Sequence, residues 1–112
     1  MRRFRVKSTI DLYWAEEGET RQVRGTTRDI NEHGAAVVIP SKIPVGEKVF
    51  FVSRDHSSSV TARVRHVTSQ GLQYVVGLEF QGQPMAARMR RNCNVKAVKT
   101  EDGESVFVVD VL

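Results

Sequence analysis

The chain is poor in the residues and runs that build disulfides, membrane spans and export signals. Its 112 residues include a single cysteine, Cys93, which excludes an internal disulfide and suits a reducing compartment. No apolar run approaches the roughly 18 residues that a transmembrane helix needs. The basic N-terminus lacks the apolar stretch of a signal peptide. We therefore expect a cytoplasmic protein without a membrane anchor.

Sequence signals of catalysis are also missing. The chain has no nucleophile elbow, no P-loop and no glycine-rich dinucleotide fingerprint. Cys93 lies between two asparagines, and the sequence identifies no base to activate it. The histidines His33, His56 and His66 match no zinc-binding spacing and are interpreted as turn or surface residues. We expect no enzyme, no metal site and no cofactor.

Positive charge is the first feature that is present in excess. The formal net charge is +4, and twelve of the 17 cationic residues are arginines. The planar guanidinium binds phosphate or a guanine edge through two hydrogen bonds and also stacks on bases. Two stretches, 2–7 and 88–99, are basic and free of acidic residues. They indicate an anionic partner, although two solvated surfaces would look the same at this level.

The rest of the chain is a series of short β-type runs separated by turn residues. Strands are predicted over 4–12, 20–29, 35–39, 48–53, 60–65 and 72–80. In the last of these, Tyr74, Val76, Leu78 and Phe80 share one face. The run Asn31–Gly34 predicts a tight turn, because Asn and Gly both tolerate positive φ. Even spacing without intervening helices favours an antiparallel barrel or sandwich.

The tail differs from the part before it. Pro84–Arg91 is predicted to form two helical turns, with proline near the start and cations near the end. Strands over 95–99 and 105–111 flank Glu101-Asp102-Gly103, a hairpin signal. We therefore expect one domain over 1–112, with the barrel at about 4–82 and a helix and hairpin extension at 83–112.

Two local patterns carry the functional signal. The first is the arginine cluster Arg2-Arg3-Phe4-Arg5 ahead of the first strand, and the second is Asp29-Ile30-Asn31-Glu32-His33-Gly34 at the end of the second. In this order they resemble the PilZ domain family of bacterial cyclic di-GMP receptors. That family has Arg-x-x-x-Arg before its first strand and Asp/Asn-x-Ser-x-x-Gly on its barrel. The apolar runs 34–38 and 75–80 are similar to two of its strands, so the resemblance covers roughly residues 2–82.

The resemblance implies a mainly β fold, a six-stranded antiparallel barrel, with cyclic di-GMP as ligand and a downstream protein as partner. It implies a binding site of Arg2, Arg3, Arg5, Asp29, Asn31 and Gly34. Two positions depart from the family pattern. Met1 stands four residues before Arg5, so Arg2 or Arg3 must take the place of the first arginine. Asn31 stands where the family usually has Ser. Both departures bear on affinity more than on fold.

The residue types fit such a ligand. Arginine pairs with guanine O6 and N7 or neutralises phosphate, and Asp29 is an acceptor suited to the N1–H and N2–H₂ edge of guanine. Asn31 offers hydrogen bonds to base or phosphate, and Gly34 permits close approach to the backbone. The leading hypothesis is that the arginines clamp the nucleotide from an N-terminal arm, whose ordering against the barrel relays the signal.

Two other hypotheses stay open. The chain is a PilZ-like adaptor that has lost the nucleotide and works through protein contacts, or it is a small nucleic-acid-binding barrel. Against the latter, the predicted strands do not interleave exposed aromatics with cations, as single-strand binders do. The sequence predicts neither the oligomeric state nor the number of nucleotides bound.

Overall fold

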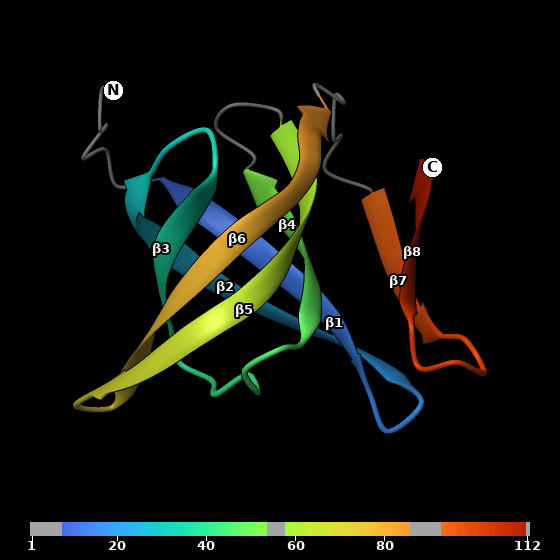
Figure 1. Cartoon of the computed structure of the whole chain (residues 1–112), viewed down its shortest axis with the longest axis horizontal. Coiled ribbons are helices and arrows are strands. Elements are labelled where there is room, and N and C mark those ends of the chain that lie inside the picture. The colour runs from blue at the N-terminus through green and yellow to red at the C-terminus, as the bar shows by residue number, and fades with distance from the viewer. Residues whose placement is uncertain (1–7, 54–57, 86–92, 112) are drawn as a thin grey trace.

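Eight β-strands form in this computed structural model, which describes residues 8–53, 58–85 and 93–111 (Figure 1). In chain order they are β1 (Thr9–Glu16), β2 (Glu19–Ile30), β3 (Gly34–Ile39), β4 (Lys48–Ser53), β5 (Ser58–Gln70), β6 (Gln73–Met85), β7 (Cys93–Lys99) and β8 (Ser105–Val111).

The first six strands close into a barrel. Their order around the wall is β1-β2-β3-β6-β5-β4, and each neighbouring pair is antiparallel. The closing pair joins β1 to β4, with Ile10 opposite Ser53 and Tyr13 opposite Phe50. Closure leaves none of these strands with an unpaired edge along the barrel wall. The predicted six-stranded antiparallel barrel is thus confirmed.

The barrel interior is the main hydrophobic core. Every strand of the barrel contributes inward side chains, because residues two apart in a strand point to the same side. The buried members include Ile10, Leu12, Trp14, Val23, Val37, Ile39, Val49, Phe51, Val64, Val76 and Leu78. The rings of Phe51 and Phe80 meet at 5.3 Å between centroids. Tyr74 and Phe80 pack against the same core as Val76 and Leu78, as predicted for that strand.

Several strands extend beyond their predicted limits, and β1, β5 and β6 continue four or five residues past their expected ends. β1 continues to Glu16, past the expected end at Leu12, while residues 4–7 of the predicted strand lie outside the described residues. β5 continues to Gln70 and pairs with β6 as a long twisted ribbon that projects from the barrel (Figure 1). The side chains from Thr68 to Gln70 are exposed. Backbone pairing rather than apolar burial holds this end of β5. A prediction from the apolar residues therefore ends the strand too early.

The predicted helix over Pro84–Arg91 is wrong at its start. Pro84 and Met85 belong to β6, and the remaining positions lie outside the described residues. The ladder between β5 and β6 is irregular here, since Thr61 pairs with Gln81 and Ser59 with Met85. Proline lacks an N–H donor and is tolerated at such bulges.

Within the described ranges there is no helix with the length and hydropathy to cross a membrane.

The tail forms the predicted hairpin. β7 and β8 make a separate two-stranded sheet, which stands beside the barrel in Figure 1. Its inner face packs on the outside of β1 and β4, where Tyr13, Val52 and Val95 are buried and Phe50, Phe107 and Val109 pack against them. The rings of Phe50 and Phe107 stack at 5.5 Å. This second cluster holds an otherwise marginal hairpin in place.

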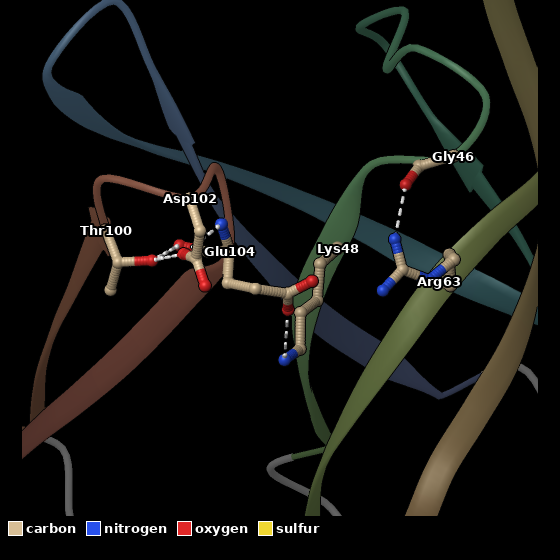
Figure 2. Close-up of polar contacts among 6 residues, drawn as sticks. All are labelled: Gly46, Lys48, Arg63, Thr100, Asp102 and Glu104. Carbon is tan, nitrogen blue, oxygen red and sulfur yellow. Dashed lines mark hydrogen bonds and ion pairs between the residues drawn. The ribbon is translucent and has the colours of Figure 1, made fainter.

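Polar contacts fix the position of the hairpin on the barrel. The Ala97 N–H donates to Thr20 Oγ1 at 2.9 Å, so a side chain of β2 pairs with the edge of β7. Lys48 pairs with Glu104 at 3.6 Å, as Figure 2 shows. Lys99 pairs with Glu47 at 3.5 Å. Ion pairs that remain partly exposed contribute little each, so the apolar cluster supplies most of the docking energy.

Candidate functional site

Four residues on neighbouring strands form one row across the outer wall of the barrel. Asp29 of β2 pairs with Ala36 of β3, Ala36 pairs with Gly77 of β6, and Gly77 pairs with His66 of β5. The row therefore reads carboxylate, methyl, hydrogen, imidazole. Its two central members, Ala36 and Gly77, have small side chains, so the surface between Asp29 and His66 projects little from the strand backbones. Asp29, which the sequence analysis identified as a site residue, and His66, which it did not, thus lie at the two ends of this row.

Two β-bulges aim the ends of this row outward. The β2–β3 register shifts between Thr27 and Asp29, and the β5–β6 register shifts between Val64 and His66. Thr27 and Val64 are buried, so strict alternation would turn Asp29 and His66 inward as well. An extra residue at each bulge reverses this phase. Asp29 is half-buried and His66 exposed as a result.

The imidazole of His66 lies over Gly77. A Cβ built on Gly77 would be 2.2, 2.3 and 2.7 Å from Cε1, Nε2 and Nδ1 of that ring. Three ring atoms at such similar distances mean that the ring presents its face, not its edge, to the glycine. One face of the imidazole thus rests on the backbone of β6. Any larger residue at position 77 would displace the ring.

A concavity of about 340 Å³ opens over this row. It is lined by Asp29, Asn31, His33, Gly34, Ala35, Ala36, Arg65, His66, Gly77, Leu78 and Glu79. Three of the predicted site residues, Asp29, Asn31 and Gly34, are among them. The space is of the size that small-molecule sites usually have.

Asn31 shapes the turn between β2 and β3. Its Oδ1 accepts the N–H of His33 at 2.7 Å and the N–H of Gly34 at 3.1 Å, which is an Asx turn. The backbone closes the same turn, with the Asn31 N–H donating to the Gly34 carbonyl at 2.9 Å. Since Oδ1 is engaged twice, a ligand would meet the Nδ2 side of this amide.

The turn over Asn31–Gly34 is confirmed, but the reason given for it is wrong. Neither Asn31 nor Gly34 is among the described residues with positive φ. Gly34 is required by packing instead, because its Cβ would lie 2.1 Å from the Leu78 carbonyl oxygen. The close approach that this glycine allows is thus with strand β6.

The charges that line the concavity do not favour an anion by themselves. Two carboxylates, Asp29 and Glu79, stand against one guanidinium, Arg65. Arg65 Nη2 and Glu79 Oε1 are 2.7 Å apart. The hydrogen bond from Arg65 lowers the pKa of Glu79 below its usual value. Among the described residues no group of three or more His, Cys, Asp or Glu could hold a metal ion.

Ser8, the first residue that the structure describes, lies beside this site. The Ser8 N–H donates to Thr27 Oγ1 at 2.9 Å, and the Thr27 N–H donates to the Ser8 carbonyl at 2.9 Å. Thr27 is two residues before Asp29 on the same strand. Arg5 is three residues before Ser8, a reach of roughly 10 Å for extended chain. The predicted site residues Arg2, Arg3 and Arg5 themselves lie outside the described residues.

Sequence reasoning missed His66, Gly77, Arg65 and Glu79 as parts of this site. A signal for the first of these was present in the order Val64-Arg65-His66-Val67, where two polar residues stand between two apolar ones. Thr27-Arg28-Asp29-Ile30 has a similar interruption. A break in strict alternation of this kind indicates a bulge. Pairing β5 with β6 was needed to bring His66 to Gly77.

The chain thus forms a closed β-barrel with a concavity on its outer wall. The family model of the PilZ domain matches residues 1–95. The chain therefore belongs to the PilZ domain family, which is generally a family of cyclic di-GMP receptors and comprises binding and adaptor domains. No curated protein matches the sequence. Most of the hairpin lies beyond the matched residues.

Proposed function

We propose that this protein is a cyclic di-GMP receptor whose nucleotide lies in the concavity over Asp29, Ala36, Gly77 and His66. One observation carries the proposal. The residues Asp29, Asn31 and Gly34 of the family motif line one ligand-sized space. Beside it, Ser8 is hydrogen-bonded to Thr27, two residues before Asp29 on β2. The arginines that precede Ser8 are therefore within chain reach of the same space.

The division of roles follows from charge. The lining residues carry more negative than positive charge, so they suit a base better than a phosphate. Asp29 accepts from the N1–H and N2–H₂ groups of a guanine, and the Asn31 amide donates from Nδ2. Arg2, Arg3 and Arg5 supply the cations that two phosphates need.

Signal relay in this proposal depends on the same arginines. The bound phosphates hold the segment before Ser8 against the barrel, which changes the surface that a downstream protein meets. A cytoplasmic location fits a receptor for a soluble nucleotide and stays a prediction.

Calorimetric titration with cyclic di-GMP tests the proposal, with GTP as the control ligand. We expect saturable binding that GTP does not reproduce. Asp29→Ala and Arg5→Ala should each abolish most of it. Arg21→Ala is the matched control, because Arg21 is an exposed arginine at the far end of β2 and pairs with Glu16 and Glu19. Unchanged affinity in Arg5→Ala would reject that residue's role.

Salt separates the receptor from a nucleic-acid binder. A polynucleotide site loses affinity steeply as salt rises, because many counterions are released. A site for two phosphates releases few. A weak dependence for cyclic di-GMP, with no retention of single-stranded DNA at the same salt, is expected. Tight and steeply salt-dependent DNA binding would favour the nucleic-acid barrel instead.

A protein adaptor without nucleotide is the second candidate, and the outer face of the hairpin favours it. Val98 and Val106 are cross-strand partners, Val108 lies on the same face, and all three are nearly half exposed. β-branched residues at three neighbouring exposed positions suit contact with another protein. Absence of any nucleotide binding, in a protein that is folded, would leave this candidate.

A further inference from the structure

Two imidazole rings line the concavity, those of His33 and His66, and the ring of His66 rests on a strand. His66 comes from β5, outside both motifs, and shares its row with Asp29 at the other end. One face of its imidazole covers Gly77. The side chain is nevertheless exposed, so the opposite face is turned toward solvent at the concavity. A flat ring backed by a strand is a platform for a planar ligand.

We propose that His66 stacks on a purine base of the bound nucleotide while Asp29 accepts hydrogen bonds from the edge of that base. This inference rests on the proposed receptor function and adds a binding residue to it. Neighbouring strands are about 4.8 Å apart, so Gly77 and Asp29 are separated by roughly 10 Å along the row. The imidazole already covers Gly77, and only the methyl group of Ala36 lies between the ring and Asp29, so a base stacked on the ring would turn its edge toward Asp29.

Stacking and edge recognition make different demands on the base. Stacking is tolerant of base identity, because every base has a π face. A carboxylate is selective, because the guanine edge offers two donors whereas the adenine edge presents an acceptor at N1. His66 therefore contributes affinity, and Asp29 contributes preference. The two residues are separable by comparing cyclic di-GMP with cyclic di-AMP.

Calorimetry on four proteins provides the first test. His66→Ala should weaken cyclic di-GMP binding roughly tenfold, as expected for the loss of one stacked base. His66→Phe keeps a flat ring and should remain within about threefold of the wild type. Thr68→Ala is the matched control, because Thr68 is an exposed residue two positions further on the same strand and does not line the concavity. His66→Ala should leave the ratio of the two ligands unchanged.

Gly77 gives an independent test through a double-mutant cycle. In Gly77→Ala the new Cβ would occupy the place of the imidazole ring, so the ring must move away. Its loss of affinity should match that of His66→Ala. In a protein that already carries His66→Ala, the same glycine substitution should cost much less. Equal costs in both backgrounds would mean that the glycine acts on the ligand directly and would contradict the platform.

Proton NMR gives a readout that does not depend on affinity. The ring protons of His66, assigned by their absence in His66→Phe, should move upfield on addition of cyclic di-GMP, because a stacked purine shields them. Unshifted ring protons at saturation would overturn the proposal. Affinity of His66→Ala within about twofold of the wild type, with binding lost in Asp29→Ala, would reject the stacking and leave the receptor intact. A wild-type protein that binds no cyclic di-GMP would reject both.

Discussion

Two parts of the outer barrel wall differ in what covers them. Over β1 and β4 the outward residues Tyr13, Phe50 and Val52 are large and apolar, and the hairpin covers them. Over β3 and β6 the outward residues at the level of the site include Gly34, Ala36 and Gly77, which are small, beside the charged Glu79, and a concavity remains. Both stretches use the same backbone geometry and the same antiparallel pairing.

The difference shows that the outward-facing side chains of a barrel decide whether a part of its surface is covered by a further layer or stays open. Large apolar side chains there recruit a further layer, because their burial stabilises the fold by about 25 cal/mol per Å². Small residues flanked by polar ones recruit no layer and leave backbone and polar groups accessible to a ligand. The bulges in β2 and β5 add Asp29 and His66 to the second surface. Substitutions on the two surfaces test this contrast.

The largest effect is expected where the hairpin meets the barrel. Phe107→Ala removes the ring that stacks on Phe50 and should lower the free energy of unfolding by about 2 kcal/mol, less than for a fully buried Phe. Hydrogen exchange of β7 and β8 should accelerate. The matched control is Val108→Ala, its neighbour on the opposite face of β8. Equal losses for the two variants would show that the inner face is not what holds the hairpin.

The two glycines of the open surface should differ from each other. Gly34→Ala directs its Cβ at a backbone oxygen 2.1 Å away and should lower the free energy of unfolding by about 1–2 kcal/mol, because β3 and β6 must separate. Gly77→Ala meets only the exposed His66 ring, which can rotate, and should change stability little. Urea unfolding of both variants measures this. Comparable destabilisation would mean that the ring is held more firmly than its exposure indicates.

A smaller effect is expected at the turn beside the site. Asn31→Ala removes an acceptor shared by two backbone N–H groups and should cost about 1 kcal/mol in the free energy of unfolding. Asn31→Asp keeps the acceptor and should retain most of the stability. Thermal unfolding compares them. If alanine is tolerated as well as aspartate, the Asx turn is not what defines the β2–β3 connection.

The smallest effect concerns the exposed pair of Arg65 and Glu79. The lowered pKa of Glu79 means that its contribution is present above the ordinary value of 4.5 and is lost as pH falls through the lower folded value. The stability difference between the wild type and Glu79→Gln should therefore shrink from pH 7 to pH 3. Arg65→Gln should reproduce the pattern. A difference that grows with acid would contradict this sign.

Much of the architecture was predictable from local pattern. Short β-type runs separated by turn residues predicted the six strands of the barrel, and Lys48–Ser53 has the same bounds in the structure. Glu101-Asp102-Gly103 predicted the hairpin. The order of the two motifs predicted the family and brought attention to Asp29, Asn31 and Gly34. These features depend on residues that are close together in the chain, so the local sequence is enough to predict them.

Other features depend on contacts between distant strands, and only the tertiary structure decided them. The local sequence predicts a helix start at Pro84, whereas this residue belongs to β6 where the ladder with β5 is irregular. His66 is exposed, as predicted, but only the register with β6 lays its ring on Gly77. The local sequence explains Gly34 by turn conformation, whereas the structure requires a glycine there because a Cβ would collide with the Leu78 carbonyl oxygen. Local sequence determined which residues form strands, and strand register, which long-range pairing sets, determined which side chains meet at the site.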